Sequence, residues 1–305
     1  MEKPLVTIIT VNFDHPKITC ALLESLRHIT YPNIEIIVVD NASPKDDPAI
    51  IKQTFPEIKF IQSKTNLGFA GGNNLAIREA KGKYCLFINN DTEVEPGFLE
   101  PLVDKLENNS HIGAVSPKLK FYFQPDIIQF AGQAPMNPYT VRSYGYGYGA
   151  KDTGQFEKDT PTFFVHGAAM MMPLEVIRKV GMMADVYFLY YEELDWGARI
   201  RAAGYELWYV HNSTVMHKES ISTGRLTPFK TYYMNRARIL YLRRNVTGLT
   251  FLIAFLFQTF VSIPKNSLVF LFKGQKGHFL AYQKAIFWHV KNIFIKDIRS
   301  NPVLK

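Results

Sequence analysis

Three short segments of the chain carry side chains that could do chemistry, and the first is 86–94, LFINNDTEV. Its apolar run ends in two amides and one carboxylate, Asn89, Asn90 and Asp91. Such an ending is typical of a strand that delivers polar groups to the mouth of a cleft. A hard divalent cation prefers several oxygen ligands, and one carboxylate is too few. A metal bound here would therefore need further ligands from elsewhere.

The second segment is 190–201, YYEELDWGARIR, which places three acids at the start of an expected helix. Acids in a first turn suit the helix macrodipole, and Asp195 with Arg199 forms an i, i+4 pair. Glu192 shares the stripe of Asp195, whereas Glu193 falls in line with the apolar residues of the helix. An acid on the apolar stripe points inward, where partial burial raises its pKa toward that of a useful general base.

The third segment is 215–220, VMHKES, which follows a strand-like run at 207–210. Its imidazole is that of His217. A single histidine is more often structural than a metal ligand, so its interest depends on which site it could complete.

The elements that must position these groups alternate between strand and helix patterns over the first 90 residues. Alternation at this pace predicts βαβ units and a parallel sheet. Ligands of such sheets sit at the carboxyl ends of the strands, and three expected strands end in polar groups, at 10–12, 40–41 and 89–91. We therefore expect a binding site at this edge. The expected strands are 6–11, 34–39, 59–61 and 84–88, and the expected helices are 17–27, 48–55 and 73–81.

Two loops have unusual compositions. The loop 66–74, NLGFAGGNN, precedes an expected helix, where glycines permit close backbone approach to a ligand and the helix N-terminus favours anions. It does not match G-x-G-x-x-G, so a dinucleotide fingerprint is poorly supported. The loop 144–149 alternates tyrosine with glycine. An exposed, mobile loop is the favoured interpretation, and a loop whose rings stack on a sugar or a base is the alternative.

Bulk composition indicates one large α/β domain, or such a domain with an appendage. The chain has 305 residues, of which 47% are hydrophobic and 20% are charged. Two cysteines, Cys20 and Cys85, are too few for a disulfide framework and fit a reducing compartment. The N-terminus runs directly into an expected strand without the pattern of a secretory signal.

The net charge of +8 is concentrated in the segment 246–305, which has eight Lys or Arg residues and one acid, a balance of +7. Within it, 249–263 is apolar almost all round but shorter than the roughly 20 residues that span a bilayer, and 264–266 is expected to interrupt it. Segment 280–299 carries a stripe of Tyr282, Ile286, His289 and Ile293, with lysines beside it. We expect these helices to lie in a membrane interface. A core helix pair and a spanning helix are the alternatives, and nucleic acid is not an expected partner.

Taken in order, the motifs resemble the family 2 glycosyltransferases with a GT-A fold, notably the rhamnosyltransferase-like branch. They are TIITVNF, IIVVDNAS, NLGFAGGNN, LFINNDTEV, VHGAAMMM, YFLYYEELDWGARIRAAGY and VMHKES. The resemblance covers residues 4–245. It implies a Rossmann-like, nucleotide-binding sheet with helices on both faces in domain 1–245, followed by a basic, apolar helical extension at 246–305 that associates with the membrane.

The resemblance also assigns roles to particular residues. Asn89-Asn90-Asp91 matches the family's Asp-x-Asp motif with Asn first, so Asp91, His217 and the donor's diphosphate would hold Mg²⁺ or Mn²⁺. The family's Glu-Asp motif aligns with Glu192-Glu193. This places the base at Glu193, with Glu192 and Asp195 as alternatives. The residues expected to bind the nucleotide sugar are Thr10, Val11, Asn12, Asp40, Asn66, Gly71, Asn74, Asn89, Asn90 and Gly167.

The implied reaction is inverting transfer of a sugar from a UDP- or dTDP-linked donor to a hydroxyl of a glycan or lipid-linked glycan. It belongs to cell-surface polysaccharide synthesis at the cytoplasmic face of the membrane. A nucleotidyltransferase is an alternative, but the loop 12–16 lacks a basic phosphate-binding signature. A non-catalytic, membrane-associated glycan-binding scaffold is a second alternative. The sequence indicates no oligomeric state.

Overall fold

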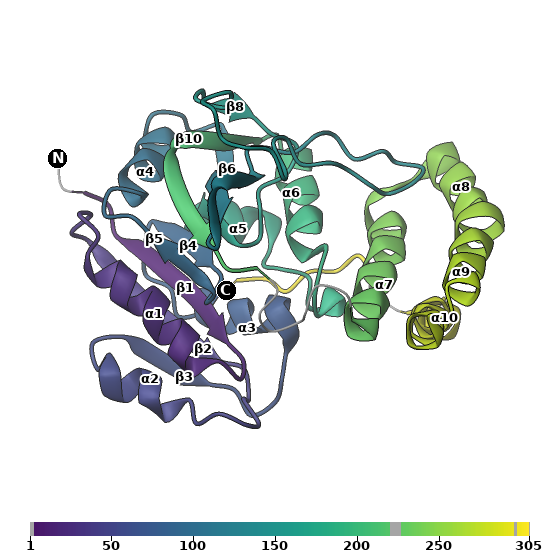
Figure 1. Ribbon diagram of the computed structural model, residues 1–305. Coiled ribbons are helices and arrows are strands. Elements are labelled where there is room, and N and C mark those ends of the chain that lie inside the picture. Colours follow the sequence, from purple (N-terminus) through teal and green to yellow (C-terminus); the bar gives the residue numbers. More distant parts are fainter. Residues whose placement is uncertain (1–2, 220–226, 296–297, 305) are drawn as a thin grey trace.

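The structure is a computed structural model that describes residues 3–219, 227–295 and 298–304. Its centre is a mixed sheet that begins with four parallel strands in the order β3-β2-β1-β4 (Figure 1). This confirms the parallel sheet predicted for the first 90 residues. The bounds are β1 (Val6–Asn12), β2 (Ile34–Asp40), β3 (Lys59–Gln62) and β4 (Tyr84–Ile88).

The second half of the sheet mixes directions. Strand β9 runs antiparallel to both β4 and β6, and β6 runs parallel to β10. The end of β10 pairs with β5, with His217 opposite Thr92. This register brings the segment 215–220, which contains His217, beside the segment 86–94, which contains Asp91. The bounds are β5 (Thr92–Val94), β6 (Ile112–Phe121), β7 (Gln124–Phe130), β8 (Thr160–Pro161), β9 (Ala169–Pro173) and β10 (Glu206–His217).

Helices cover both faces of the sheet, as predicted. Ile8 and Ile9 of β1 illustrate the alternation, because Ile8 packs in the cluster that contains α1 and α4, and Ile9 in the cluster that contains α3, α5 and α6. The bounds are α1 (Pro16–Arg27), α2 (Ala49–Thr54), α3 (Gly68–Ile77), α4 (Leu99–Glu107), α5 (Leu174–Val180), η1 (Asp185–Tyr187) and α6 (Glu192–Ala202).

Helix α3 begins at Gly68, five residues before the start expected at residue 73. The glycines of this segment are therefore helical and do not form a loop. A Cβ atom at Gly72 would lie 3.0 Å from Val11 Cγ1, so glycine lets the helix pack closely against β1. The same close packing holds α3 against the sheet edge where the polar strand ends meet.

The C-terminal part consists of α7 (Pro228–Asn245), α8 (Gly248–Phe257), a π-helical turn (Gln258–Ser262), α9 (Ile263–Phe272) and α10 (Lys276–Lys291). The expected interruption at 264–266 is wrong. A π-turn precedes Pro264, and the proline sits in the first turn of α9, so the missing N–H and the ring are accommodated. Gly248–Phe272 is one helix of 25 residues, the one described helix long and apolar enough to cross a membrane, judged by length and composition alone.

Helix α10 packs against α7 through the face that was expected to meet the membrane. Tyr282, Ala285 and His289 are buried, and His289 Nε2 lies 2.8 Å from the carbonyl oxygen of Arg236. Ile293, which belongs to the same expected stripe, is exposed. The apolar side chains that face outward lie elsewhere on the helix, among them Phe287 and Val290.

After α10 the chain returns to the sheet domain, drawn in yellow in Figure 1. Met182 N donates to Pro302 O over 2.8 Å, and Leu304 packs against the cluster that contains α3, α5 and α6. Residues 298–304 therefore form a strap across α5 and α6, although they follow the helical extension in sequence.

Candidate active site

A cavity of about 810 Å³ opens at the carboxyl ends of β1 and β4, between the start of α6, the end of β10 and helix α7. Its size is that of a small-molecule site. The structure thus brings nine of the residues singled out in the sequence to one cavity. They are Val11, Asn66, Asn89, Asn90, Asp91, Gly167, Glu192, Glu193 and His217.

Asp91 and His217 face each other in this cavity, with 3.1 Å between Asp91 Oδ1 and His217 Nε2. His217 Nδ1 lies 2.8 Å from Gln129 Oε1, an acceptor. A ring protonated at Nδ1 would donate to this oxygen and would present the lone pair of Nε2 to the cavity. A lone pair and a carboxylate oxygen at this distance both need a positive partner, either a proton or a metal ion. Among the described residues no group of three His, Cys, Asp or Glu side chains gathers around an ion site. This pair fits a metal that takes its remaining ligands from a substrate and from water.

Glu193 projects from the first turn of α6 beside Gly167, where an added Cβ atom would lie 3.6 Å from Glu193 Cγ. Burial raises the pKa of Glu193 to about 7. A carboxylate with this pKa can accept a proton near neutral pH. The direction agrees with the effect predicted from the apolar stripe.

Glu192 is more deeply buried than Glu193, with 3% of its surface exposed. Burial and the nearby charge of Glu193 raise the pKa of Glu192 well above its usual range. Its Oε2 atom has no hydrogen-bond partner among the described residues. The helical phase drawn from the sequence is wrong on this point, because Glu192 and Asp195 are buried more completely than Glu193.

Strained backbone fixes the start of α6. Phe188, Tyr190 and Tyr191 all have φ between 66° and 69°, a region that is costly for bulky residues. The segment is secured by neighbouring elements, because Phe69 N donates to Phe188 O over 2.7 Å and Tyr191 Oη donates to the carbonyl oxygen of Val141. These contacts give the acidic turn a defined position in the cavity.

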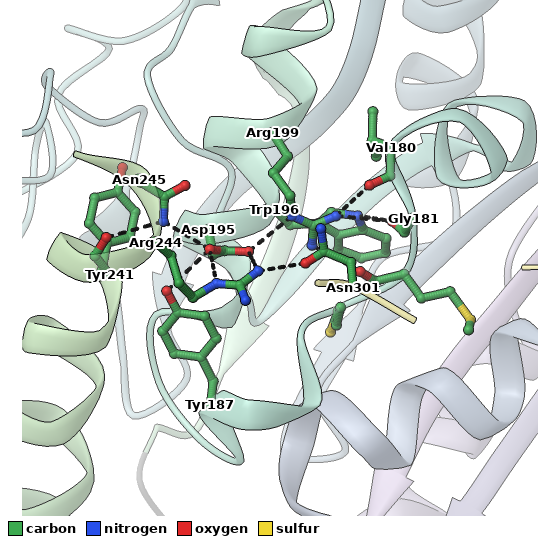
Figure 2. A network of polar contacts seen from close by, with 12 residues as sticks. Val180, Gly181, Tyr187, Asp195, Trp196, Arg199, Tyr241, Arg244, Asn245 and Asn301 are labelled. Carbon is green, nitrogen blue, oxygen red and sulfur yellow. Dashed lines mark hydrogen bonds and ion pairs between the residues drawn. The ribbon is translucent and has the colours of Figure 1, made fainter. Parts of the chain in front are cut away.

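Asp195 lies outside the cavity wall, in the polar network of Figure 2. Arg244 Nε donates to Asp195 Oδ1 over 2.8 Å, and Arg199 Nε donates to Oδ2 over 3.0 Å. Tyr187 and Asn245 donate to Oδ1 as well. Burial acts to raise the pKa of Asp195, but these hydrogen bonds and the two arginine charges outweigh it and hold the pKa below its usual range. A carboxylate so fully bonded is a structural ion and not an available base.

Asp40 and Asn12 also lie behind the cavity wall. Asn12 Nδ2 donates to Asp40 Oδ1, Thr19 Oγ1 donates to Asn12 Oδ1, and Asn90 Nδ2 donates to Thr19 Oγ1, each over 2.8–3.0 Å. This buried chain of hydrogen bonds fixes the side chain of Asn90 at the cavity. Asp40 is fully buried, and its carboxylate accepts hydrogen bonds from Asn12 and Ser43. It therefore presents no free oxygen to the nucleobase of a donor in the cavity.

Three further residues expected at the nucleotide sugar lie off the cavity wall. Thr10 is fully buried in β1. Gly71 is in the interior of α3, where a Cβ atom would lie 2.7 Å from Leu67 Cβ. Asn74 exchanges hydrogen bonds with the backbone of Met183, so it ties α3 to the segment before η1. All three support elements that form the cavity.

Several cavity residues were missed in the sequence. Asn41 lines the cavity in place of its neighbour Asp40 and donates through Nδ2 to Asn66 Oδ1 over 3.0 Å. A second group comes from the end of β7, from the loop between β7 and β8 and from α7, which carry no chemical motif. The members of this group include Gln129, Arg142, Tyr148, Lys230, Met234 and Arg238. Only the alternating Tyr-Gly pattern around Tyr148 offered a signal.

Comparison with known proteins agrees with this geometry. The model of glycosyl transferase family 2 matches residues 7–181. The N-acetylglucosaminyl-diphospho-decaprenol L-rhamnosyltransferase of Mycobacterium tuberculosis is 24% identical over 224 residues, which is 67% of this chain and 72% of that protein.

Solved structures share the fold. The mannosyltransferase PcManGT from Pyrobaculum calidifontis, in complex with GDP-Man and Mn²⁺, aligns with a TM-score of 0.57 at 14% identity, over 97% of this chain and 89% of that one. GalNAc-T7 with UDP, GalNAc and Mn²⁺ aligns with a TM-score of 0.62 at 14% identity, over 80% of this chain and 48% of that one. The fold is therefore GT-A. This chain belongs to glycosyl transferase family 2 and is a glycosyltransferase of glycan biosynthesis.

Proposed function

We propose that this glycosyltransferase inverts the anomeric configuration as it moves a sugar from a UDP- or dTDP-linked donor to a hydroxyl of a lipid-linked glycan. The observation that carries the proposal is the pairing, in one cavity, of a carboxyl with a pKa near 7 and an Asp–His pair. The carboxyl would act on the acceptor hydroxyl, and the Asp–His pair would act, through a metal ion, on the leaving group.

Glu193 would take the proton from the acceptor hydroxyl. The hydroxyl oxygen would attack the anomeric carbon from the face opposite the nucleotide, so one displacement inverts the configuration. Asp91 and His217 would hold Mg²⁺ or Mn²⁺, which when bound supplies positive charge to the departing diphosphate. Gly167, beside Glu193, leaves space for the donor sugar and the acceptor.

The C-terminal helices support a proposal for where in the cell the reaction takes place. The helix Gly248–Phe272 exposes most of its large apolar side chains, and the segment 246–305 carries seven of the eight net positive charges. Apolar and basic surface together favour binding to anionic lipid. The protein would act as a peripheral protein on the inner face of the cell membrane, where lipid-linked acceptors are accessible.

Calorimetry of a panel of nucleotide sugars, with and without Mn²⁺, tests the donor site. We expect one donor to bind in a metal-dependent way, Asp91→Asn to weaken that binding at least about tenfold, and Glu193→Gln to leave it nearly intact. The matched control is Asp126→Asn, which alters an exposed carboxylate of β7.

The reaction product tests the class of chemistry. Free nucleoside diphosphate is expected, whereas release of pyrophosphate would indicate a nucleotidyltransferase. Absence of metal-dependent binding for every nucleotide sugar in the panel would contradict the proposal and would favour a non-catalytic, glycan-binding role.

A further inference from the structure

Positive charge gathers on the side of the cavity formed by α7 and the loop between β7 and β8. Arg238 and Lys230 of α7 and Arg142 of the loop all line the cavity. Asp91 and His217, proposed above for the metal and the donor's diphosphate, come instead from the turn between β4 and β5 and from the end of β10. The cavity therefore has a second polar region that the donor site does not use.

Arg238 is held by neutral partners. Its Nε atom donates to Tyr191 Oη over 3.2 Å, and Nη1 donates to Asn235 Oδ1 over 3.0 Å. Tyr191 directly precedes the two glutamates of α6, so Arg238 lies close to the proposed base. Arg238 is partly exposed and lines the cavity wall.

Arg142 approaches the same place from the loop. Arg142 and Arg238 line the same cavity. The charges of both arginines also act on the Tyr282 hydroxyl of α10 and oppose the rise of its pKa on burial. Within residues 3–219, 227–295 and 298–304, no acidic side chain forms an ion pair with Arg142 or with Arg238. Two arginines without acidic partners in one cavity favour a ligand that carries more than one negative charge.

This region adjoins the long apolar helix. Gln258, in the π-turn between α8 and α9, donates through Nε2 to the carbonyl oxygens of Tyr139 and Thr140, over 3.1 and 3.3 Å. The loop that carries Arg142 is thereby fixed to the helix Gly248–Phe272, and Figure 1 shows it reaching from the sheet to α8. A ligand bound at the arginines would have apolar helix surface beside it.

We propose that Arg142 and Arg238, assisted by Lys230, bind the diphosphate of a polyprenyl-diphosphate-linked saccharide acceptor. Its sugar then faces Glu193 and its lipid chain leaves along α8 and α9. The inference rests on the proposed function and names the acceptor class of that same site. A phospholipid headgroup in a bilayer surface is a poorer fit, because Arg238 is partly buried inside the cavity. A neutral glycan would leave the two positive charges uncompensated.

Binding of farnesyl diphosphate to the full-length protein in EDTA tests the site apart from the metal-dependent donor site. Arg142→Ala and Arg238→Ala are each expected to weaken binding about tenfold to a hundredfold, which is the scale of charge-assisted hydrogen bonds. His217→Ala and Arg178→Ala, an exposed arginine of α5, should bind as the wild type does. Farnesyl monophosphate should bind more weakly, and farnesol should show no dependence on either arginine.

Equal affinity for farnesyl diphosphate in the wild type and both arginine variants would overturn the inference. So would a loss of binding to phosphatidylglycerol vesicles in Arg142→Ala and Arg238→Ala with farnesyl diphosphate binding unchanged, because the arginines would then serve the bilayer surface. The conservative Arg238→Lys should recover part of the affinity if charge is what matters. These assays use no donor sugar, so their failure is separable from failure of metal-dependent donor binding.

Discussion

Two adjacent glutamates illustrate how local environment separates chemical roles. Burial raises the pKa of Glu193 to about 7, whereas burial and the charge of Glu193 raise the pKa of the more deeply buried Glu192 well above its usual range. The pKa of Glu193 suits proton exchange near neutral pH. Burial favours the protonated form of Glu192, which can donate a hydrogen bond to a substrate oxygen.

The base assignment leads to a prediction on pH dependence. In the proposed mechanism deprotonated Glu193 is the active form, so kcat/KM should rise about tenfold per pH unit below pH 7 and level off above it. Glu193→Gln should lower kcat about 10²- to 10⁴-fold and remove this dependence. Glu192→Gln keeps the shape of a side chain that is not the proposed base, so the pH dependence should remain. Steady-state kinetics from pH 5 to 9 measure both, and a Glu193→Gln profile that still rises through pH 7 would exclude Glu193 as the base.

At the residue level, the sequence predicts the chemistry of a side chain better than it predicts the direction in which that side chain points. The raised pKa of Glu193 follows from an acid placed among apolar helix positions. The burial of Asp40 does not, since it depends on the turn after β2, where Ala42 has a φ of 60° and Ser43 folds back onto the carboxylate. Asn41 takes the position at the cavity wall as a result.

At the scale of helices and strands, the network around Asp195 connects segments that lie far apart in the sequence. Asp195 is in α6, its partner Arg244 is in α7, and Arg244 also donates to the backbone of Ile298 and Ser300 in the strap. One buried ion pair therefore joins the acidic helix, the helix that carries Arg238 and the returning chain. The sequence showed only the local Asp195–Arg199 pair, because Arg244 lies 49 residues from Asp195 and the strap residues Ile298 and Ser300 lie a further 54 and 56 residues beyond Arg244.

Removal of this charge should be costly. Asp195→Asn keeps the shape but leaves two buried arginine charges without a counter-ion, and we expect a loss of about 3–5 kcal/mol in the free energy of unfolding. The pKa of Asp195 is lowered in the folded state, so its stabilisation is present at neutral pH and is lost as the pH falls below the carboxyl's usual range. Urea denaturation at pH 7 measures the change.

Glu79→Gln provides the matched control for Asp195→Asn. Glu79 pairs with Lys59 over 2.6 Å, but both side chains are largely exposed, and solvent screens such a pair so that it contributes little to stability. If the two variants lose the same stability, the buried network does not join the elements as described.

Segment periodicity predicted most elements of the sheet domain and failed where packing overrode composition. The glycines at 68–72 are typical of a loop, yet they lie in α3, where Gly72 lets the helix pack closely against Val11 of β1. Pro264 is typical of a helix break, yet the π-turn before it lets the helix continue. Neither outcome is visible without the neighbouring element.

At the scale of the whole molecule, composition located the basic, apolar extension but not its outward face. The stripe of Tyr282 and His289 was expected at the lipid, and it packs on α7 because α7 itself needs a partner for its buried side. The exposed apolar surface belongs chiefly to the helix Gly248–Phe272. The cavity arginines lie between this helix and the sheet, so lipid binding and acceptor binding would share one side of the protein.

The exposed helix face gives a test of membrane binding that leaves the fold intact. Deletion of 249–305 would also remove the strap that bonds Arg244, so loss of binding would be ambiguous. The double variant Leu256→Glu, Phe260→Glu instead places charge on side chains that are 44% and 70% exposed. Burial of two such side chains in lipid is worth about 3–6 kcal/mol, so co-sedimentation with anionic liposomes should fall at least about a hundredfold.

Phe123→Glu, at a 74% exposed phenylalanine after β6, should bind as the wild type does. Equal co-sedimentation of all three proteins would place the membrane contact elsewhere.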